Sequence, residues 1–217
     1  MSVMCASPSA KFSKLLSSRL LLPDQLQLNA INLIEAQYQA LLIGKTARSL
    51  YLHSSPGRGK TILGGLLMDA PGVRRFHFHV LMLSIHQSLH RIRMMRGTDN
   101  PINVLSSELA SSARLFFIDE VEITDVADAS LLNRLHDAIL KKGASFFFTS
   151  NSAPEQLYKG GLNVGIFQPS FANRVRALIR GETRFPLFDF LNSFGQGSFS
   201  RRSGGFRGLC PRFLASA

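Results

Sequence analysis

The sequence predicts an α/β fold with a mostly parallel sheet flanked by helices. Short apolar runs alternate with longer segments of helical periodicity, which is typical of parallel sheets. Two of these runs, residues 114–118 and 144–150, are apolar on both faces, as central parallel strands require. In addition, residues 54–61 form a glycine-rich loop between a short strand-like run and a helix-like segment. Together these observations favour an α/β domain of a nucleotide-binding type.

The loop at residues 54–61 has the order of a phosphate-binding loop: strand, glycine-rich turn, lysine, hydroxyl residue and helix. Its first position is serine, where the motif GxxxxGK[ST] has glycine. The glycines permit the backbone angles with which successive N–H groups turn toward a phosphate. Lys60 would supply positive charge to the β- and γ-phosphates of ATP, and Thr61 a hydroxyl ligand for Mg²⁺. The predicted nucleotide-binding residues are Ser54, Ser55, Pro56, Gly57, Arg58, Gly59, Lys60 and Thr61.

Acidic and amide side chains end the two doubly apolar strands. Asp119 and Glu120 follow the first strand, and Asn151 follows the second. Because ligands bind beyond the carboxyl ends of parallel strands, we expect these side chains beside the phosphate-binding loop. Asp119 would hold Mg²⁺ together with Thr61, and Glu120 would orient or deprotonate the attacking water. Asn151 would contact the γ-phosphate or position that water; the alternative for it is a turn-forming residue. The combination predicts an AAA-type P-loop NTPase.

The other elements are predicted from periodicity and from residues that favour helix ends. The helix that follows Glu120 should be capped by Thr124 and bury Val126, Leu131, Leu135 and Ile139. Gly64 and Gly65 are costly inside a helix, so we expect them to allow tight packing on the sheet. We expect one further strand at residues 76–81, and helices at residues 26–42, 62–69, 85–95 and 104–109.

Composition limits the domain organisation and the partners. The 217 residues are enough for one core with appendages. We expect residues 1–20 to be disordered or a basic N-terminal segment, with an organelle transit peptide as the alternative. The P-loop domain would span 21–183, and 184–217 would form a disordered tail rich in Gly, Ser and Arg. A net charge of +11 favours anionic partners, without choosing among nucleotides, nucleic acid, acidic proteins and anionic lipid.

The cysteines and the hydropathy bear on the compartment. Cys5 and Cys210 lie near opposite ends of the sequence without the spacing of metal ligands, which suggests a reducing compartment. No apolar run has the length of a transmembrane helix, so we expect no such segment, although peripheral membrane contact stays open.

The histidines permit a metal hypothesis, which we rank low. His86 and His90 share one face of a predicted helix, as in zinc proteases, but Gln87 replaces the glutamate that would act as base. Helix-surface histidines are therefore the better interpretation. His77 and His79 would share one strand face, where we expect a packed polar patch.

Several longer stretches extend these motifs. They comprise residues 50–53 with 57–61, residues 74–79 with His86, residues 119–120, 124–129 and 149–151, and Pro154, residues 157–158 and 161–162. On these residues the chain resembles, from about residue 21 to 169, the ZapE family of AAA-type ATPases. The family comprises bacterial cell-division proteins with mitochondrial relatives.

The resemblance implies Mg²⁺-dependent hydrolysis of ATP to ADP and phosphate. It also implies a protein partner, the tubulin-like protein of the division ring. The location would be cytoplasmic, with the mitochondrion as the alternative, and a homo-oligomer is compatible with the family.

The sequence departs from the family at three places. Ser54 and Ser55 replace the usual glycine pair. Val164 and Ile166 stand where the family has arginines. One of those arginines is a candidate arginine finger, which would reach the γ-phosphate bound by a neighbouring subunit. Arg174 or Arg176 could take over this role only if the backbone follows another path. From about residue 171 no match is found, so the member would be C-terminally truncated or divergent. These departures favour, as an alternative, a nucleotide-binding scaffold with little turnover. A nucleic-acid-dependent ATPase, suggested by the charge and the tail, ranks lowest, and we expect no nucleic-acid partner.

Overall fold

Four parallel strands form the central sheet of the structure, a computed structural model that describes residues 6–18, 25–96, 100–153 and 157. The strand order is β1-β4-β3-β2, and each neighbouring pair is parallel, as predicted. The four strands end at the same level: His53 lies opposite Ser150 and His77 opposite Asp119. Their carboxyl ends therefore form one edge of the sheet, perpendicular to the strands. The strands are β1 (Leu50–His53), β2 (Val73–His77), β3 (Leu115–Asp119) and β4 (Ser145–Ser150).

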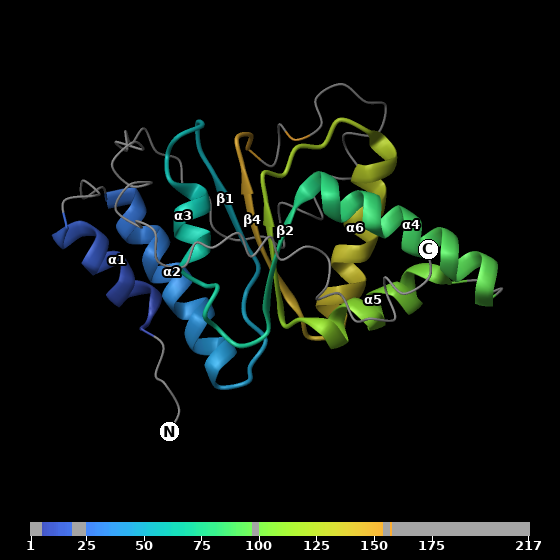
Figure 1. Ribbon diagram of the computed structural model, residues 1–217, viewed down its shortest axis with the longest axis horizontal. Coiled ribbons are helices and arrows are strands. Elements are labelled where there is room, and N and C mark those ends of the chain that lie inside the picture. Colours follow the sequence, from blue (N-terminus) through green and yellow to red (C-terminus); the bar gives the residue numbers. More distant parts are fainter. Residues whose placement is uncertain (1–5, 19–24, 97–99, 154–156, 158–217) are drawn as a thin grey trace, which may run out of the picture.

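Helices cover both faces of this sheet (Figure 1). One face packs against α1 (Pro8–Ser17), α2 (Gln25–Leu42) and α3 (Lys60–Gly65). The other face packs against α4 (Phe78–Arg96), α5 (Pro101–Ser112) and α6 (Val126–Lys141).

The alternation of side chains along the strands explains this arrangement. Leu115 and Phe117 of β3 belong to the first core, and Phe116 and Ile118 to the second. Successive strand residues point to opposite faces, so a sheet covered on both sides needs uninterrupted apolar runs. The doubly apolar runs were therefore reliable signals for β3 and β4.

Side-chain caps fix where several helices begin. Ser7, Asn100 and Asp125 each accept a hydrogen bond from a backbone N–H in the first turn of α1, α5 and α6, respectively. The cap of α6 is thus Asp125 and not Thr124 as predicted. Within α6, Leu135 and Ile139 are buried and Leu131 packs against the same core, as expected. The side chain of Val126 lies outside the described residues.

Gly64 allows α3 to lie directly on the sheet. A Cβ atom at Gly64 would come within 2.4 Å of Phe117 Cζ on β3. The expectation of tight packing is therefore confirmed for Gly64. A Cβ at Gly65 would meet none of the described residues within 4 Å, so the expectation is wrong for that residue.

Several predicted boundaries are wrong. Residues 78–81 belong to α4, and the strand precedes them as β2. The half-buried β2 carries Arg74 and Arg75, which hide its strand pattern, whereas Phe78, Leu81 and Met82 are buried at helical spacing. In addition, α5 runs from Pro101 instead of residue 104, and α3 ends at Gly65 instead of residue 69.

The N-terminal segment contributes to the core of the domain. The expectation that residues 1–20 are disordered is wrong for Pro8–Ser17, which form α1. Phe12 and Leu15 are buried in the cluster that includes α2 and α3, so this core begins before residue 21. Residues 1–5 and 19–24 and the predicted tail at 184–217 lie outside the described residues. Within the described part of the chain, no helix is long and apolar enough to cross a membrane.

Candidate functional site

The phosphate-binding loop joins β1 to α3 at the edge where the strands end. Gly57 and Gly59 have φ angles of +76° and +77°, a left-handed conformation that glycine adopts without a Cβ clash. Gly59 also precedes the first residue of α3. At the other end of the loop, the N–H of Ser54 donates to the carbonyl of Ser150, 3.3 Å away. The loop therefore has the two glycine conformations that the motif predicts, and it is attached to β4.

Lys60 lies folded back on this loop. Its Nζ donates to the carbonyl oxygens of Ser54 at 2.8 Å and Ser55 at 3.0 Å, and to Ser54 Oγ at 3.2 Å. Burial lowers the pKa of Lys60, and the carboxylate of Asp119 opposes this lowering. The positive charge of Arg58 lowers this pKa further. A phosphate at this place would give the ammonium group an anionic partner in place of the neutral carbonyls.

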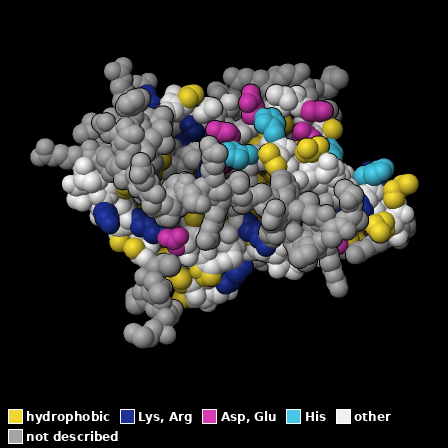
Figure 2. All heavy atoms as spheres, viewed as in Figure 1, with side chains coloured by type: hydrophobic (Ala, Val, Ile, Leu, Met, Phe, Trp, Pro, Cys, Tyr) yellow, Lys and Arg dark blue, Asp and Glu magenta, His cyan; other side chains and the backbone are white. Residues whose placement is uncertain are grey.

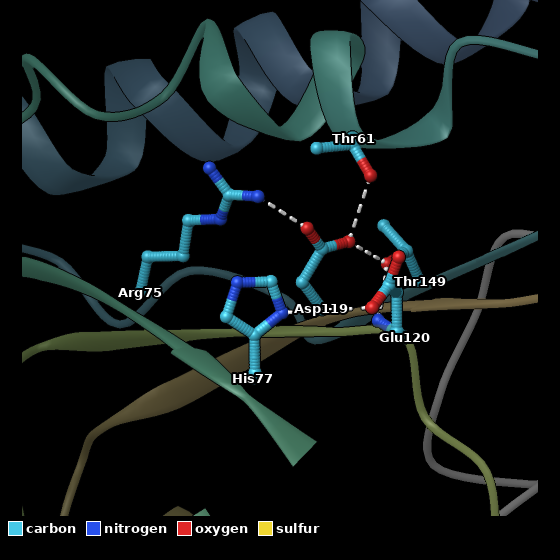
Figure 3. Close-up of polar contacts among 6 residues, drawn as sticks. All are labelled: Thr61, Arg75, His77, Asp119, Glu120 and Thr149. Carbon is cyan, nitrogen blue, oxygen red and sulfur yellow. Dashed lines mark hydrogen bonds and ion pairs between the residues drawn. The ribbon is translucent and has the colours of Figure 1, made fainter. Parts of the chain in front are cut away.

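Asp119 is the centre of a buried polar cluster (Figure 3). The carboxylate is 1% exposed. Its Oδ1 accepts hydrogen bonds from Thr61 Oγ1 at 3.0 Å and from the hydroxyl of Thr149. Its Oδ2 accepts from Arg75 Nη2 at 2.5 Å, which is also an ion pair. The cluster thus joins α3, β2, β3 and β4 through one carboxylate.

Arg75 and Thr149 were not predicted as site residues. The Arg75 guanidinium lies over the Phe117 ring at 5.3 Å, a cation–π contact that fixes it beside Asp119. Thr149 Oγ1 also accepts a hydrogen bond from the backbone N–H of Glu120 at 3.1 Å. The strand was predicted at residues 76–81, so Arg75 was not placed in it. A strand at residues 73–77 places its end beside Asp119, where a buried carboxylate requires a partner.

Glu120 adopts an unusual backbone conformation directly after Asp119. Its φ angle is +58°, the one positive φ outside glycine among the described residues. Such a conformation is sparsely populated and is concentrated at functional sites. The Glu120 side chain is 73% exposed, and its Oε2 lies 3.6 Å from His77 Nδ1. The conformation therefore places an accessible carboxylate next to the buried one.

Asn151 follows β4 at the same edge and is exposed. The loop after Glu120 supports its position, because the Val121 N–H donates to the Thr149 carbonyl and Ser150 Oγ donates to the Val121 carbonyl, both at 2.7 Å. The predicted residues Lys60, Thr61, Asp119, Glu120 and Asn151 therefore all lie at one edge of the sheet. Their individual roles stay predictions.

The expectations for the histidines have different outcomes. His77 ends β2 whereas His79 belongs to α4, so the prediction of one shared strand face is wrong. On α4, His86 Nε2 lies 2.7 Å from Asp128 Oδ1 of α6, and His90 is exposed. No group of three or more His, Cys, Asp or Glu suited to a metal ion occurs in the part of the chain that the structure describes. Val164, Ile166, Arg174 and Arg176 lie outside the described residues.

The chain resembles known proteins in sequence. A sequence model of the AFG1-like ATPase family matches residues 8–176. The cell division protein ZapE of Escherichia coli K12 is 29% identical over 193 residues, which cover 76% of this chain and 51% of ZapE. Lactation elevated protein 1 homolog B of Danio rerio is 30% identical over 158 residues, 68% of this chain and 31% of that protein.

A third relative is an uncharacterised protein of Schizosaccharomyces pombe. It is 38% identical over 128 residues, covering 56% of this chain and 28% of that protein. The chain therefore spans about half or less of the length of these curated relatives.

Solved structures share the fold. Domain III of the replication initiation protein DnaA from Thermotoga maritima superimposes with a TM-score of 0.54 at 12% identity, over 77% of this chain and 66% of that one. DnaA bound to AMPPCP and single-stranded DNA has a TM-score of 0.50 at 14% identity, over 83% of this chain and 55% of that one.

Fold and site together define a P-loop NTPase. The parallel sheet, the glycine loop that ends in Lys60 and Thr61, and the buried Asp119 at the end of β3 are the parts that this class requires. Within this class, the chain belongs to the AFG1-like ATPase family. The predicted ZapE-type resemblance is thereby confirmed.

Proposed function

We propose that this chain binds ATP together with Mg²⁺ and hydrolyses ATP to ADP and phosphate. The observation that carries the proposal is the 3.0 Å contact between Thr61 Oγ1 and Asp119 Oδ1, from segments 58 residues apart in the sequence. The phosphate-binding loop and the acidic strand end are thus brought together at one point. DnaA, which shares the fold, has been solved with AMPPCP bound, which supports a nucleotide as the ligand.

The residues at this point fit Mg²⁺. Both Thr61 Oγ1 and Asp119 Oδ1 are oxygen donors, which this hard cation prefers. Mg²⁺ sites in nucleotide-binding proteins use one or two protein ligands and leave the other positions to phosphate and water, so a single carboxylate suffices. When bound, Mg²⁺ would neutralise charge on the β- and γ-phosphates. Thr61 and Asp119 would hold it, and Arg75 and Thr149 would keep the Asp119 carboxylate in position.

The chain's own residues would divide the work of hydrolysis. The left-handed turns at Gly57 and Gly59 let the loop backbone approach the phosphates closely, and Lys60 would exchange its carbonyl partners for phosphate oxygens. The exposed carboxylate of Glu120 would accept a proton from the attacking water or orient that water. Asn151, at the end of the neighbouring strand, would hydrogen-bond the γ-phosphate.

Binding can be tested separately from turnover. Isothermal titration of ATP in the presence of Mg²⁺ should give saturable binding to the wild-type chain. The Lys60→Ala variant should show none, because the point charge for the β- and γ-phosphates is gone. Equal ATP affinities of wild type and Lys60→Ala would overturn the assignment of the site.

A protein partner is a second part of the proposal. The relative ZapE is a cell division protein, and the family resemblance implies a tubulin-like division-ring protein as the candidate. Partner binding would then depend on the nucleotide state of the chain. Co-sedimentation with polymers of the tubulin-like protein in ATP, ADP and nucleotide-free buffer would test this, and equal binding in all three would contradict it.

A further inference from the structure

The side chain of Gln27, near the start of α2, is buried without using its polar atoms. The residue is 3% exposed, and neither Nε2 nor Oε1 has a hydrogen-bond partner among the residues that the structure describes. A carboxamide removed from water without partners destabilises the protein, so such groups are rare in folded proteins. The described fold satisfies neither polar atom, so both are available to a bound molecule.

A second buried glutamine on the same helix provides the contrast. Gln37 Nε2 donates to the carbonyl oxygen of Arg48 at 2.7 Å and to that of Phe146 at 3.3 Å. Its amide nitrogen thus joins α2 to the segment just before β1 and to β4, which is a structural role. Gln27 makes no comparable connection, although its exposure is nearly the same.

Gln27 lies toward the end of the sheet that carries the phosphate-binding loop. Near the end of α2, Gln37 bonds to the segment before β1. Nearer the start of α2, Ala30 and Ile34 line a small cavity together with Leu50 and Leu52 of β1. Helix α2 and strand β1 therefore run in opposite directions. Gln27 lies about 4.5 Å along the helix beyond Ala30, and the loop begins about 7 Å along the strand beyond Leu52.

The packing of α3 agrees with this placement. Ile31 of α2, one turn after Gln27, belongs to the same cluster as Leu63, which is three residues after Lys60. In Figure 1, α2 and α3 lie on the same face of the sheet, and the start of α2 lies toward the edge that carries the loop. The start of α2, which carries Gln27, therefore lies on the same side of the sheet as the loop and toward the same end of its strands.

A carboxamide is complementary to one particular base. Adenine presents a 6-amino donor beside the N7 acceptor, and glutamine can bond both at once with its Oε1 and Nε2. Guanine presents two acceptors along the same edge, O6 and N7, so one of the amide atoms would face a like group.

We propose that Gln27 recognises the adenine base of the bound nucleotide, with Oε1 accepting from the 6-amino group and Nε2 donating to N7. The inference rests on the proposed function, because it concerns the base of the nucleotide whose phosphates the loop holds. It makes Gln27 the residue that selects ATP over GTP.

The test compares three ligands by isothermal titration with Mg²⁺: ATP, GTP and inorganic tripolyphosphate. Wild type should bind ATP about tenfold or more tightly than GTP. Gln27→Leu should lose this preference, with ATP affinity falling about tenfold and tripolyphosphate affinity unchanged. Gln37→Leu, the matched control, should keep the wild-type ratio of ATP to GTP affinity. An unchanged ratio in Gln27→Leu would overturn the inference, as expected if Gln27 is only structural or binds a water.

A measurement on the wild type removes any dependence on the folding of the variant. The triphosphate of purine riboside lacks the 6-amino group and should bind several-fold more weakly than ATP. Equal affinities would overturn the inference while leaving ATP binding intact. If wild type binds neither ATP nor tripolyphosphate, the proposed function itself fails, so the two failures are distinguishable.

Discussion

The hydroxyl of Thr61 lies 3.0 Å from Oδ1 of Asp119, which joins the start of α3 to the end of β3. This is the contact that a Mg²⁺-nucleotide site needs, because one oxygen comes from the phosphate-binding loop and the other from the acidic end of β3. The surface around it carries histidine and acidic side chains near the edge where the strands end, as Figure 2 shows above the centre of that view.

Removal of the Thr61 hydroxyl should separate metal-dependent from metal-independent binding. Thr61→Val keeps the branched shape but removes the oxygen ligand. We expect the affinity for ATP to fall about tenfold or more with Mg²⁺ present and to change little in EDTA. Thr61→Ser, which keeps the hydroxyl, is the control and should bind as wild type does. Titration of each variant with and without Mg²⁺ checks this; an equal loss under both conditions would contradict a metal role.

Gly64 and Gly65 give a matched pair for the packing of α3. A Cβ at Gly64 would lie 2.4 Å from the buried ring of Phe117, whereas a Cβ at Gly65 would meet open space. Gly64→Ala should therefore lower the free energy of unfolding by about 1–3 kcal/mol through overpacking. Gly65→Ala should raise it by about 0.5–1 kcal/mol, because alanine favours the helix. Urea unfolding measures both, and similar effects would contradict the described packing of α3.

Arg75 should be important for stability as well as for the site. Its ion pair with Asp119 involves a carboxylate that is 1% exposed, and Arg75→Met would leave that charge with hydroxyl partners alone. We expect a loss of about 2–3 kcal/mol in the free energy of unfolding. The neighbouring Arg74→Met should cost less than about 0.5 kcal/mol. Equal losses in the two variants, measured by chemical denaturation, would contradict the role of the pair.

The lowered pKa of Lys60 predicts a pH dependence of nucleotide binding. Burial favours the neutral amine, so Lys60 loses its charge at a pH below the ordinary lysine value of 10.5. Affinity for ATP should therefore fall as the pH rises in the alkaline range before 10.5 is reached. Lys60→Arg keeps its charge there, and its affinity should stay level. Titrations across this range check the sign; a parallel decline in both proteins would show that another group is responsible.

The sequence was sufficient to predict an element where a single local pattern determined the structure. Doubly apolar runs gave β3 and β4, and glycine and lysine spacing gave the loop. It was insufficient at the edge strand β2, where half-buried arginines mask the alternation and Arg75 acquires its role only through its long-range contact with Asp119. The burial of Phe12 by α2 and the isolation of the Gln27 amide are also tertiary effects, which no local pattern predicts.

Steady-state hydrolysis of ATP by the purified chain, measured beside Lys60→Ala and Glu120→Gln, tests the central claim most directly. The account predicts Mg²⁺-dependent release of phosphate by the wild type and none by Lys60→Ala, which does not bind the nucleotide. Glu120→Gln should bind ATP as tightly as the wild type yet release no phosphate, because the amide cannot accept a proton from water. Wild-type turnover no higher than that of Glu120→Gln, despite tight ATP binding, would contradict hydrolysis and leave a nucleotide-binding scaffold.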